Sequence, residues 1–393
     1  MDLLQMTEQD VLGRFDFSAE RGFLPKTDPL ISFSLEQEGA GNLSEWMAVA
    51  RDLPDYIAQG VVREKILSLP QLSLKSVAKE EYEYAMLLCS YFGHAYVFSA
   101  TDTKSFIPRN IAIPWCFIAE KLERPPVLSY ASYCMNNWRR IDPNEPIEFG
   151  NLTLVQKFSG GFDESGFVLV HTAIEAKAGL LGSFLWNALR AAYKRDVGAV
   201  HLCLSQASTR FASMLSTLHS MLTWCDPYIY YARVRPYLFG WEDNPTFPDG
   251  VVYAGCFNGK AQKFRGETGA QSSIIPMVDA FLGVQHAQDR LWQYLQEMKR
   301  YMPWKHRQFL EVLTPHAYVM RDLMKDLSRD LRDPYNQCLF NLYLFREIHR
   351  GFTKRYIEEQ QEKAGNSTMV GTGGTPLSEY LKAHSENTLK AIL

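Results

Sequence analysis

Apolar residues recur at helical spacing through most of this 393-residue chain, and this periodicity limits the fold more than any other feature. Such spacing places one apolar stripe along a helix, and that stripe must be buried against another element. Strand-like alternation is confined to residues 167–170 and 250–253, which is too little for a sheet-based core. The helical pattern covers residues 80–92, 174–194, 209–224, 287–301 and about 335–362. The sequence therefore predicts an all-α fold.

Glycine and proline residues mark the expected interruptions and boundaries. Gly179 and Gly182 interrupt one apolar helix, and Pro334 is expected in the first turn of the last long helix, where its missing N–H is tolerated. A Pro-Pro pair within residues 121–127 stiffens an extended connection and indicates a boundary near residue 125. We therefore expect a small N-terminal helical domain over residues 1–125 and a large helical domain over residues 126–393.

Charge composition argues against one broad class of partner. The chain has 41 Lys and Arg against 44 Asp and Glu, which gives a formal net charge of −3. Nonspecific nucleic-acid binding depends on a basic field, and this balance does not supply one. We expect no nucleic-acid partner.

Cysteine usage and the N-terminal residues indicate the compartment. Seven cysteines are scattered without a CxxC pair, which disfavours a disulfide framework, a structural zinc site and a covalent haem attachment. Scattered thiols are typical of a reducing, cytoplasmic setting. The first residues lack a basic segment followed by an apolar one, and no window reaches 18 uninterrupted apolar residues. We expect a cytoplasmic protein without a membrane partner.

Aromatic residues make up 13% of the chain, which suits either a flat apolar ligand or a large ordinary core. The motifs of common enzyme classes are missing, because no GxSxG, HExxH, Walker A or strand-linked GxGxxG sequence occurs. No two of the nine histidines lie three or four residues apart, so a multi-histidine metal site on one helix is disfavoured. A haem site remains possible, since haem needs one strong protein ligand and an apolar box.

Four features have both a plain structural and a functional interpretation. His349 lies mid-helix, as a core or surface residue or as an axial haem ligand. His171 follows an apolar run and is either a core histidine or a hydrogen-bonding pocket residue. Arg235 lies among tyrosines, where it either packs on the surface or binds a carboxylate. The polar, glycine-rich segment 360–375 is either a surface loop or a lid.

Taken in order, a set of motifs resembles the indoleamine 2,3-dioxygenase family of haem enzymes, and its microbial and fungal branch more than its mammalian one. The resemblance spans roughly residues 100–390, and the ordered set is far more specific than any single motif. The motifs are RPPVLSY (124–130) with NW (137–138), GFVLVH (166–171), RPYLFGW (235–241), FRGETGAQSS (264–273), YMP (301–303) with HRQF (306–309), the helix with Arg346 and His349, and GTGGT (371–375).

For the cofactor, the resemblance implies haem b in the large helical domain, with His349 as the proximal ligand of the iron. Arg346 and Asp279 match a buried charge pair below the haem, which would orient the helix that carries the ligand. Thr268 and Gly269 belong to the loop at the haem edge.

For the substrate, the resemblance implies that Arg235 binds the carboxylate of an amino acid. Thr375 would close over the amino-acid end, as part of a lid of about residues 363–376. His171 would hydrogen-bond the indole N–H. The residues expected to line the ring of the substrate are Tyr130, Tyr133, Phe167, Tyr230 and Tyr231.

Several positions depart from the mammalian pattern. His171 replaces a distal serine, and Tyr230 and Tyr231 replace two phenylalanines. Tyr133 replaces a small cysteine, which narrows the inner pocket, and residues 267 and 268 are Glu and Thr in place of small neutral residues. These changes affect the choice of substrate more than haem binding.

The implied reaction inserts both atoms of O₂ across the indole C2–C3 bond of L-tryptophan or a related indole, giving N-formylkynurenine. The implied partners are O₂, the indole and an unidentified reductant, and the protein is expected to be a monomer. Two alternatives stay open at this point: a haem-dependent indole monooxygenase and a haem sensor without turnover. A sensor has no need of the amino-acid contacts expected of Arg235 and Thr375.

Overall fold

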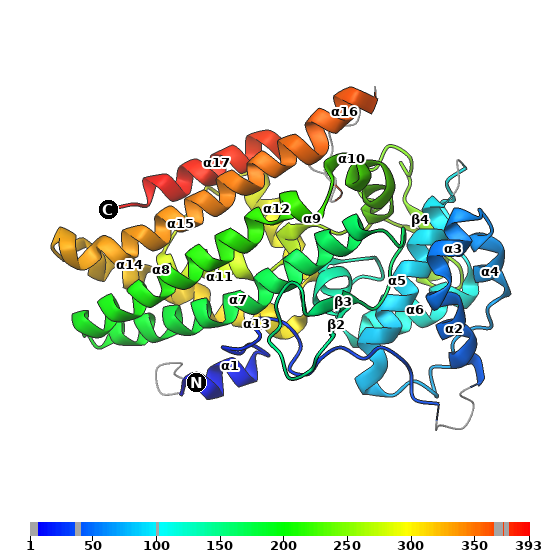
Figure 1. The fold of residues 1–393 in the computed structure, drawn as a ribbon, viewed down its shortest axis with the longest axis horizontal. Coiled ribbons are helices and arrows are strands. Elements are labelled where there is room, and N and C mark those ends of the chain that lie inside the picture. The colour runs from blue at the N-terminus through cyan, green and yellow to red at the C-terminus, as the bar shows by residue number, and fades with distance from the viewer. Residues whose placement is uncertain (1–6, 36–40, 100–101, 365–371, 373–376) are drawn as a thin grey trace.

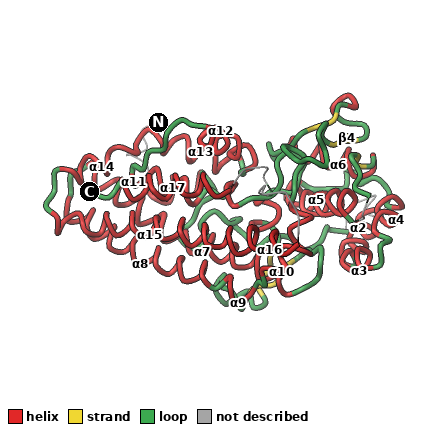
Figure 2. The backbone as a smooth tube through the Cα atoms, turned by 90° about the horizontal axis from the view of Figure 1, so that it is seen from above, coloured by secondary structure: helices red, strands yellow, loops and turns green. Residues whose placement is uncertain are grey.

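The computed structural model describes residues 7–35, 41–99, 102–364, 372 and 377–393. Helices dominate them, and strands are short, which confirms the predicted all-α class. Figure 1 shows an elongated molecule with long helices gathered at one end and α2 to α6 at the other, and the view from above agrees (Figure 2).

The N-terminal part packs around one buried helix. Almost every residue of α5 (Tyr82–Phe98) is buried, and α4 and α6 pack against it. The sequence predicted a helix over residues 80–92, and the observed helix runs six residues further. The other helices of this part are α1 (Glu8–Arg14), α2 (Gly41–Arg51), α3 (Leu53–Ala58), α4 (Val62–Ser68) and α6 (Arg109–Lys121).

Two small sheets connect segments that lie far apart in the sequence. Strand β1 (Phe106–Ile107) pairs in parallel with β4 (Val251–Tyr253), which pairs antiparallel with β5 (Ala261–Gln262). Strand β2 (Trp138–Arg140) pairs antiparallel with β3 (Leu152–Leu154). The predicted strand at 250–253 is thus confirmed as β4. Because β1 pairs across the predicted boundary near residue 125, the two parts share a sheet, and the division itself stays a prediction.

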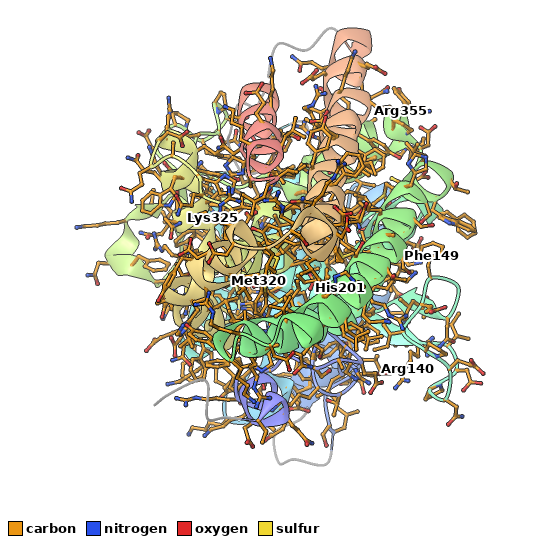
Figure 3. The ribbon with its side chains drawn as sticks, turned by 90° about the vertical axis from the view of Figure 1, so that its left-hand side faces the viewer. Arg140, Phe149, His201, Met320, Lys325 and Arg355 are labelled. Carbon is orange, nitrogen blue, oxygen red and sulfur yellow. The ribbon has the colours of Figure 1, made fainter. Side chains whose placement is uncertain are left out.

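The long helices form the other end of the molecule. Helix α7 (Phe162–Tyr193) packs along α8 (Val197–His219), and α15 (Arg329–Thr353) packs along α8 and α17 (Leu377–Lys390). Figure 3 looks onto this end, where His201 of α8 and the buried Met320 of α14 lie. The remaining helices are α9 (Met221–Trp224), α10 (Pro227–Ile229), α11 (Ile274–Leu282), α12 (Arg290–Met298), α13 (Trp304–Leu313), α14 (Ala317–Lys325) and α16 (Glu359–Ala364).

Helix α7 corrects two expectations. Residues 167–170 are helical and not a strand, because a short apolar run fits a buried helix as well as a strand. Gly179 and Gly182 do not interrupt the helix. A Cβ on Gly179 would lie 2.4 Å from the carbonyl oxygen of Ala19, and one on Gly182 would lie 2.4 Å from the ring of Phe17, so the glycines permit close packing.

Helix α7 is also the one helix of the described residues that is long and apolar enough to cross a membrane. Within the protein 78% of that apolar window is buried, as is usual for a core helix. Helix α15 begins at Arg329, six residues before the expected start, so Pro334 lies just inside the helix and not in its first turn.

Within the described residues, three π-helical turns interrupt the regular structure, at Ala131–Met135, Tyr230–Val234 and Lys354–Glu358. Such turns are rare and frequently occur at functional sites. The first two contain Tyr133, Tyr230 and Tyr231, which the sequence places at the substrate ring.

Candidate active site

The candidate site is built on one face of α7. Phe167 and His171 lie one helical turn apart, and their ring centroids are 4.6 Å apart. Nδ1 of His171 lies 2.7 Å from the carbonyl oxygen of Phe167. A carbonyl only accepts, so Nδ1 carries the proton and Nε2 keeps a free lone pair. Burial lowers the pKa of His171, which keeps the ring neutral.

The π-helical turns bring an aromatic wall to this face. The ring of Tyr130 lies 5.9 Å from that of His171, measured between centroids, and Tyr133 lies 6.3 Å from Phe167. Tyr230 stacks on Phe167 at 4.6 Å. The structure therefore gathers five residues that the sequence assigned to the substrate, and we call them the ring cluster: Tyr130, Tyr133, Phe167, His171 and Tyr230.

Arg235 follows directly on the second π-helical turn and begins a 3₁₀ turn that ends at Leu238. Its side chain is buried, and its guanidinium lies 5.3 Å from the ring centre of Tyr231 and 4.6 Å from that of Phe239. Burial lowers the pKa of Arg235, although the guanidinium stays charged. Tyr231 thus lies at the guanidinium, which suits a carboxylate site more than the substrate ring.

A buried histidine that the sequence did not assign holds this segment in place. Nδ1–H of His94 in α5 donates to the carbonyl oxygen of Tyr237 at 2.7 Å, and Nε2 accepts from the N–H of Leu128 at 2.9 Å. Burial lowers the pKa of His94 to about 3, so the ring is neutral. One imidazole therefore connects α5, Leu128 just after the Pro-Pro segment, and the turn that carries Arg235.

His349 lies on α15, the helix that packs along α8 and α17. Burial lowers the pKa of His349 to about 4, so its ring is neutral. The ring is half-buried, and among the described residues no hydrogen bond reaches its nitrogens. A neutral imidazole with available nitrogens is what a metal ligand requires.

The turn before His349 is fixed by buried charges. Arg346 Nη2 lies 2.6 and 2.9 Å from the two carboxylate oxygens of Asp279, and Nη1 donates to the hydroxyl of Thr388 in α17. His286 Nε2 donates to the same carboxylate at 3.1 Å. Burial alone would raise the pKa of Asp279, but Arg346 and His286 lower it below its ordinary value. The sequence predicted the Arg346–Asp279 pair, but not His286.

The loop of residues 266–271 borders the ring cluster. Thr268 caps the short turn Gly269–Gln271 by accepting from the N–H of Ala270, and a Cβ on Gly269 would meet nothing within 4 Å. Gln271 accepts from the N–H of Tyr130 at 2.8 Å and donates to the carbonyl oxygen of Gly266 at 2.9 Å. Gln271 therefore fixes the loop to the aromatic wall and leaves open space beside Gly269.

Two buried carboxyl groups lie at the site, although the sequence assigned neither a role. Glu175 lies one turn after His171 and accepts from the hydroxyl of Ser272 at 2.7 Å, and burial raises its pKa to about 7. Glu267 is 3% exposed, and burial raises its pKa to about 8. The sequence shows both as acidic residues, but only the fold shows their burial.

The predicted lid lies mostly outside the described residues, and Thr375 is among those left out. Thr372 is described. Its hydroxyl donates to the carbonyl oxygen of Glu267 at 2.5 Å, and its own carbonyl accepts from the N–H of Gly240 at 3.4 Å. Thr372 therefore contacts both loops that border the site.

Comparisons with known proteins agree with this geometry. The family described as indoleamine 2,3-dioxygenase matches residues 11–391. Indoleamine 2,3-dioxygenase 1 of Rattus norvegicus is 32% identical over 88% of this chain and 89% of its own. Indoleamine 2,3-dioxygenase acdA of Aspergillus candidus is 30% identical over 96% of both chains. The indoleamine 2,3-dioxygenase of Saccharomyces cerevisiae is 28% identical over 98% of this chain and 94% of its own.

The fold and the site are those of an all-helical oxidoreductase of the dioxygenase class. The chain belongs to the indoleamine 2,3-dioxygenase family, as the motifs predicted. Relatives of the mammalian and fungal branches both match. Family membership favours a dioxygenase that acts on an indole over the monooxygenase and the sensor that the sequence left open.

Proposed function

We propose that the chain binds haem b through His349. Three observations support this ligand: the imidazole is neutral, its nitrogens have no hydrogen bond within the described residues, and Arg346 fixes its helix through Asp279. The open space beside Gly269 fits a flat cofactor edge. When bound, haem supplies an iron that binds and activates O₂.

We propose further that L-tryptophan, or a closely related indole, is the substrate and that N-formylkynurenine is the product from tryptophan. Arg235 would bind the carboxylate as a bidentate pair, and a charge-assisted contact of this kind contributes about 1.5–3 kcal/mol. The indole would lie against the ring cluster, where its N–H donates to Nε2 of His171. This lone pair is available because Nδ1 is occupied by Phe167.

The protein residues orient the substrate and exclude water from it. Ring-cluster side chains surround one end of the amino acid, and Arg235 holds the other. Closure of the lid over residues 363–376, with Thr375 at the amino-acid end, would remove the remaining water. An unidentified reductant, a monomeric state and a cytoplasmic location complete the proposal.

The observation that carries this proposal is the neutral His349 imidazole, whose nitrogens have no hydrogen bond within the described residues, on the helix that the buried Arg346–Asp279 pair fixes. Replacing His349 with Ala should abolish or strongly weaken the Soret band of the purified protein, because the iron loses its ligand. The matched control is His219→Ala, since His219 lies exposed on α8. A Soret spectrum of His349→Ala that matches the wild type would overturn the assignment.

A further inference from the structure

The groups expected to hold the substrate come from two segments that lie far apart in the sequence. Residues 124–130 lead to Tyr130 of the ring cluster, and residues 235–241 begin with Arg235. The separation of these segments determines how far the guanidinium lies from the aromatic wall. A substrate with both a carboxylate and a ring must match that distance, because binding depends on holding both ends in one geometry.

His94 of α5 is hydrogen-bonded to both segments. Its Nε2 accepts from the backbone N–H of Leu128 at 2.9 Å, two residues before Tyr130. Its Nδ1–H donates to the carbonyl oxygen of Tyr237 at 2.7 Å, two residues after Arg235. An N–H group can only donate and a carbonyl can only accept, so the two contacts require the neutral tautomer with its proton on Nδ1. The ring is fully buried, and burial lowers the pKa of His94 to about 3, so it stays neutral.

The two backbone groups depend on this imidazole. Among the described residues, neither the N–H of Leu128 nor the carbonyl oxygen of Tyr237 has a hydrogen bond to any other group. An unpaired buried backbone group costs about as much free energy as a lost hydrogen bond. An apolar side chain in place of His94 would leave both groups unpaired, and we expect the two segments to shift relative to each other.

A second bridge joins the same two segments further from the substrate groups. The hydroxyl of Tyr253 in β4 accepts from the indole N–H of Trp241 at 2.9 Å and donates to the carbonyl oxygen of Pro126 at 2.5 Å. The ring centroids of Trp241 and His94 lie 4.9 Å apart, so the two bridges pack side by side. His94 bonds to the residues nearer to the substrate groups, so of the two bridges it acts more directly on the site.

We propose that His94 is a positioning residue that sets the distance between Arg235 and the ring cluster, and that it thereby gives the site its preference for indoles that carry a carboxylate. His94 acts through the turn that carries Arg235, so it should affect the binding of the carboxylate more than the binding of the ring. This inference rests on the proposed function and adds a residue that selects the substrate class.

The test compares L-tryptophan with tryptamine, which has the same ring and ammonium group but no carboxylate. Dissociation constants are measured from the shift of the Soret band when the holoenzyme is titrated with each ligand. His94→Leu should weaken the binding of L-tryptophan at least about tenfold and that of tryptamine less than about twofold, because a small displacement of the guanidinium disrupts a bidentate contact. A general loss of structure would weaken both ligands equally.

His94→Gln is the conservative variant. Its side-chain amide both donates and accepts, so it can replace both hydrogen bonds of the imidazole and should restore most of the affinity for L-tryptophan. Asn110→Leu is the matched control. Asn110 of α6 also bonds to two backbone groups, the carbonyl oxygens of Ile66 and Leu69, both at 2.8 Å, and these lie outside the two segments. The control should leave the ratio of the two dissociation constants unchanged.

A double variant tests whether His94 acts through Arg235. In an Arg235→Ala background, His94→Leu should cause no further loss of affinity for L-tryptophan, because changes that act on the same contact are not additive. The proposal is wrong if His94→Leu binds L-tryptophan as tightly as the wild type does, if it weakens tryptamine equally, or if the two losses add fully.

Two further results are distinguishable. If His94→Leu does not fold, His94→Asn takes its place, since its shorter amide cannot reach both segments, and the same change in ratio is expected. A wild-type holoenzyme that does not bind L-tryptophan refutes the proposed substrate. A wild type that binds it, with an unchanged ratio in the His94 variant, refutes the positioning role alone.

Discussion

The two sides of the candidate site differ in how their buried polar groups are satisfied. On the α15 side, the charges of Arg346 and Asp279 are paired and supported by His286 and Thr388. On the α7 side, the buried hydroxyl of Tyr133 has no hydrogen-bond partner within the described residues. A satisfied buried network makes one arrangement rigid, whereas unsatisfied groups favour a ligand that completes them. We therefore expect the α15 side to hold the cofactor rigidly and the α7 side to select the substrate.

The largest expected effect concerns the α15 side. Asp279→Ala should destabilise the protein by about 3–5 kcal/mol, because it leaves Arg346 as an unpaired buried charge. Chemical denaturation followed by circular dichroism measures this change. Asp322→Ala, which breaks an exposed pair with Lys325, should change stability by less than about 1 kcal/mol. Equal effects of the two variants would contradict the assignment of a rigid, charge-fixed side.

A pH dependence should follow from Glu267 on the α7 side. Its pKa rises from 4.5 to about 8, so between these values the unfolded chain releases a proton that the folded protein keeps. The contribution of the Glu267 carboxyl to folding stability is fully present below pH 4.5 and is lost as the pH rises through about 8. Glu267→Gln should therefore stabilise the protein by up to about 5 kcal/mol at the alkaline end, with no gain at the acidic end.

The melting temperature of the two proteins across this pH range is the measurement. Parallel profiles of the wild type and Glu267→Gln would show that the carboxyl is solvated, and the contrast between the two sides would be lost.

Arg235 should affect binding and not stability, in contrast to Asp279. Arg235→Ala should lower kcat/KM for tryptophan roughly 30-fold, mostly through a higher KM. This factor corresponds to about 2 kcal/mol of lost binding free energy. Its unfolding free energy should stay close to that of the wild type, since the variant also removes a buried charge. Arg235→Lys should recover only part of the loss, because an ammonium cannot form the bidentate contact. Arg233→Ala, at an exposed position, is the control, and wild-type kcat/KM in Arg235→Ala would place the carboxylate elsewhere.

His171 should give the smallest effect. The wild type should prefer tryptophan over 1-methyltryptophan, because only tryptophan donates to Nε2 of His171. His171→Ser should lower that preference by about fivefold, in line with about 1 kcal/mol for one neutral hydrogen bond. Competition assays with both substrates measure the ratio. Equal turnover of the two substrates by both proteins would show that His171 does not contact the indole N–H.

The fold was predictable where one periodicity dominates. The helical spacing of residues 80–92 and the alternation at 250–253 predicted α5 and β4. Residues 167–170 were misassigned, because an apolar run of four residues carries no periodicity that separates a strand from a buried helix. Gly179 looked like an interruption, since its close contact with Ala19 depends on a segment far away in the sequence.

The motifs predicted part of the candidate site, but the sequence did not show the buried polar contacts between distant segments. Arg346 and Asp279 were expected as a pair and form one. His94, His286 and Glu175 act through contacts between distant segments, and no local pattern shows such contacts. Glu267 was visible as a departure in the sequence, but only the fold shows that its side chain is buried.

The most direct test of the proposed reaction uses the ferrous holoenzyme, L-tryptophan and isotopically labelled O₂. Mass spectrometry of the product counts the labelled oxygen atoms. A dioxygenase places both labelled atoms in N-formylkynurenine, and this is the result that we predict. A product with one labelled atom, or haem-loaded protein that forms no product from tryptophan, would contradict it.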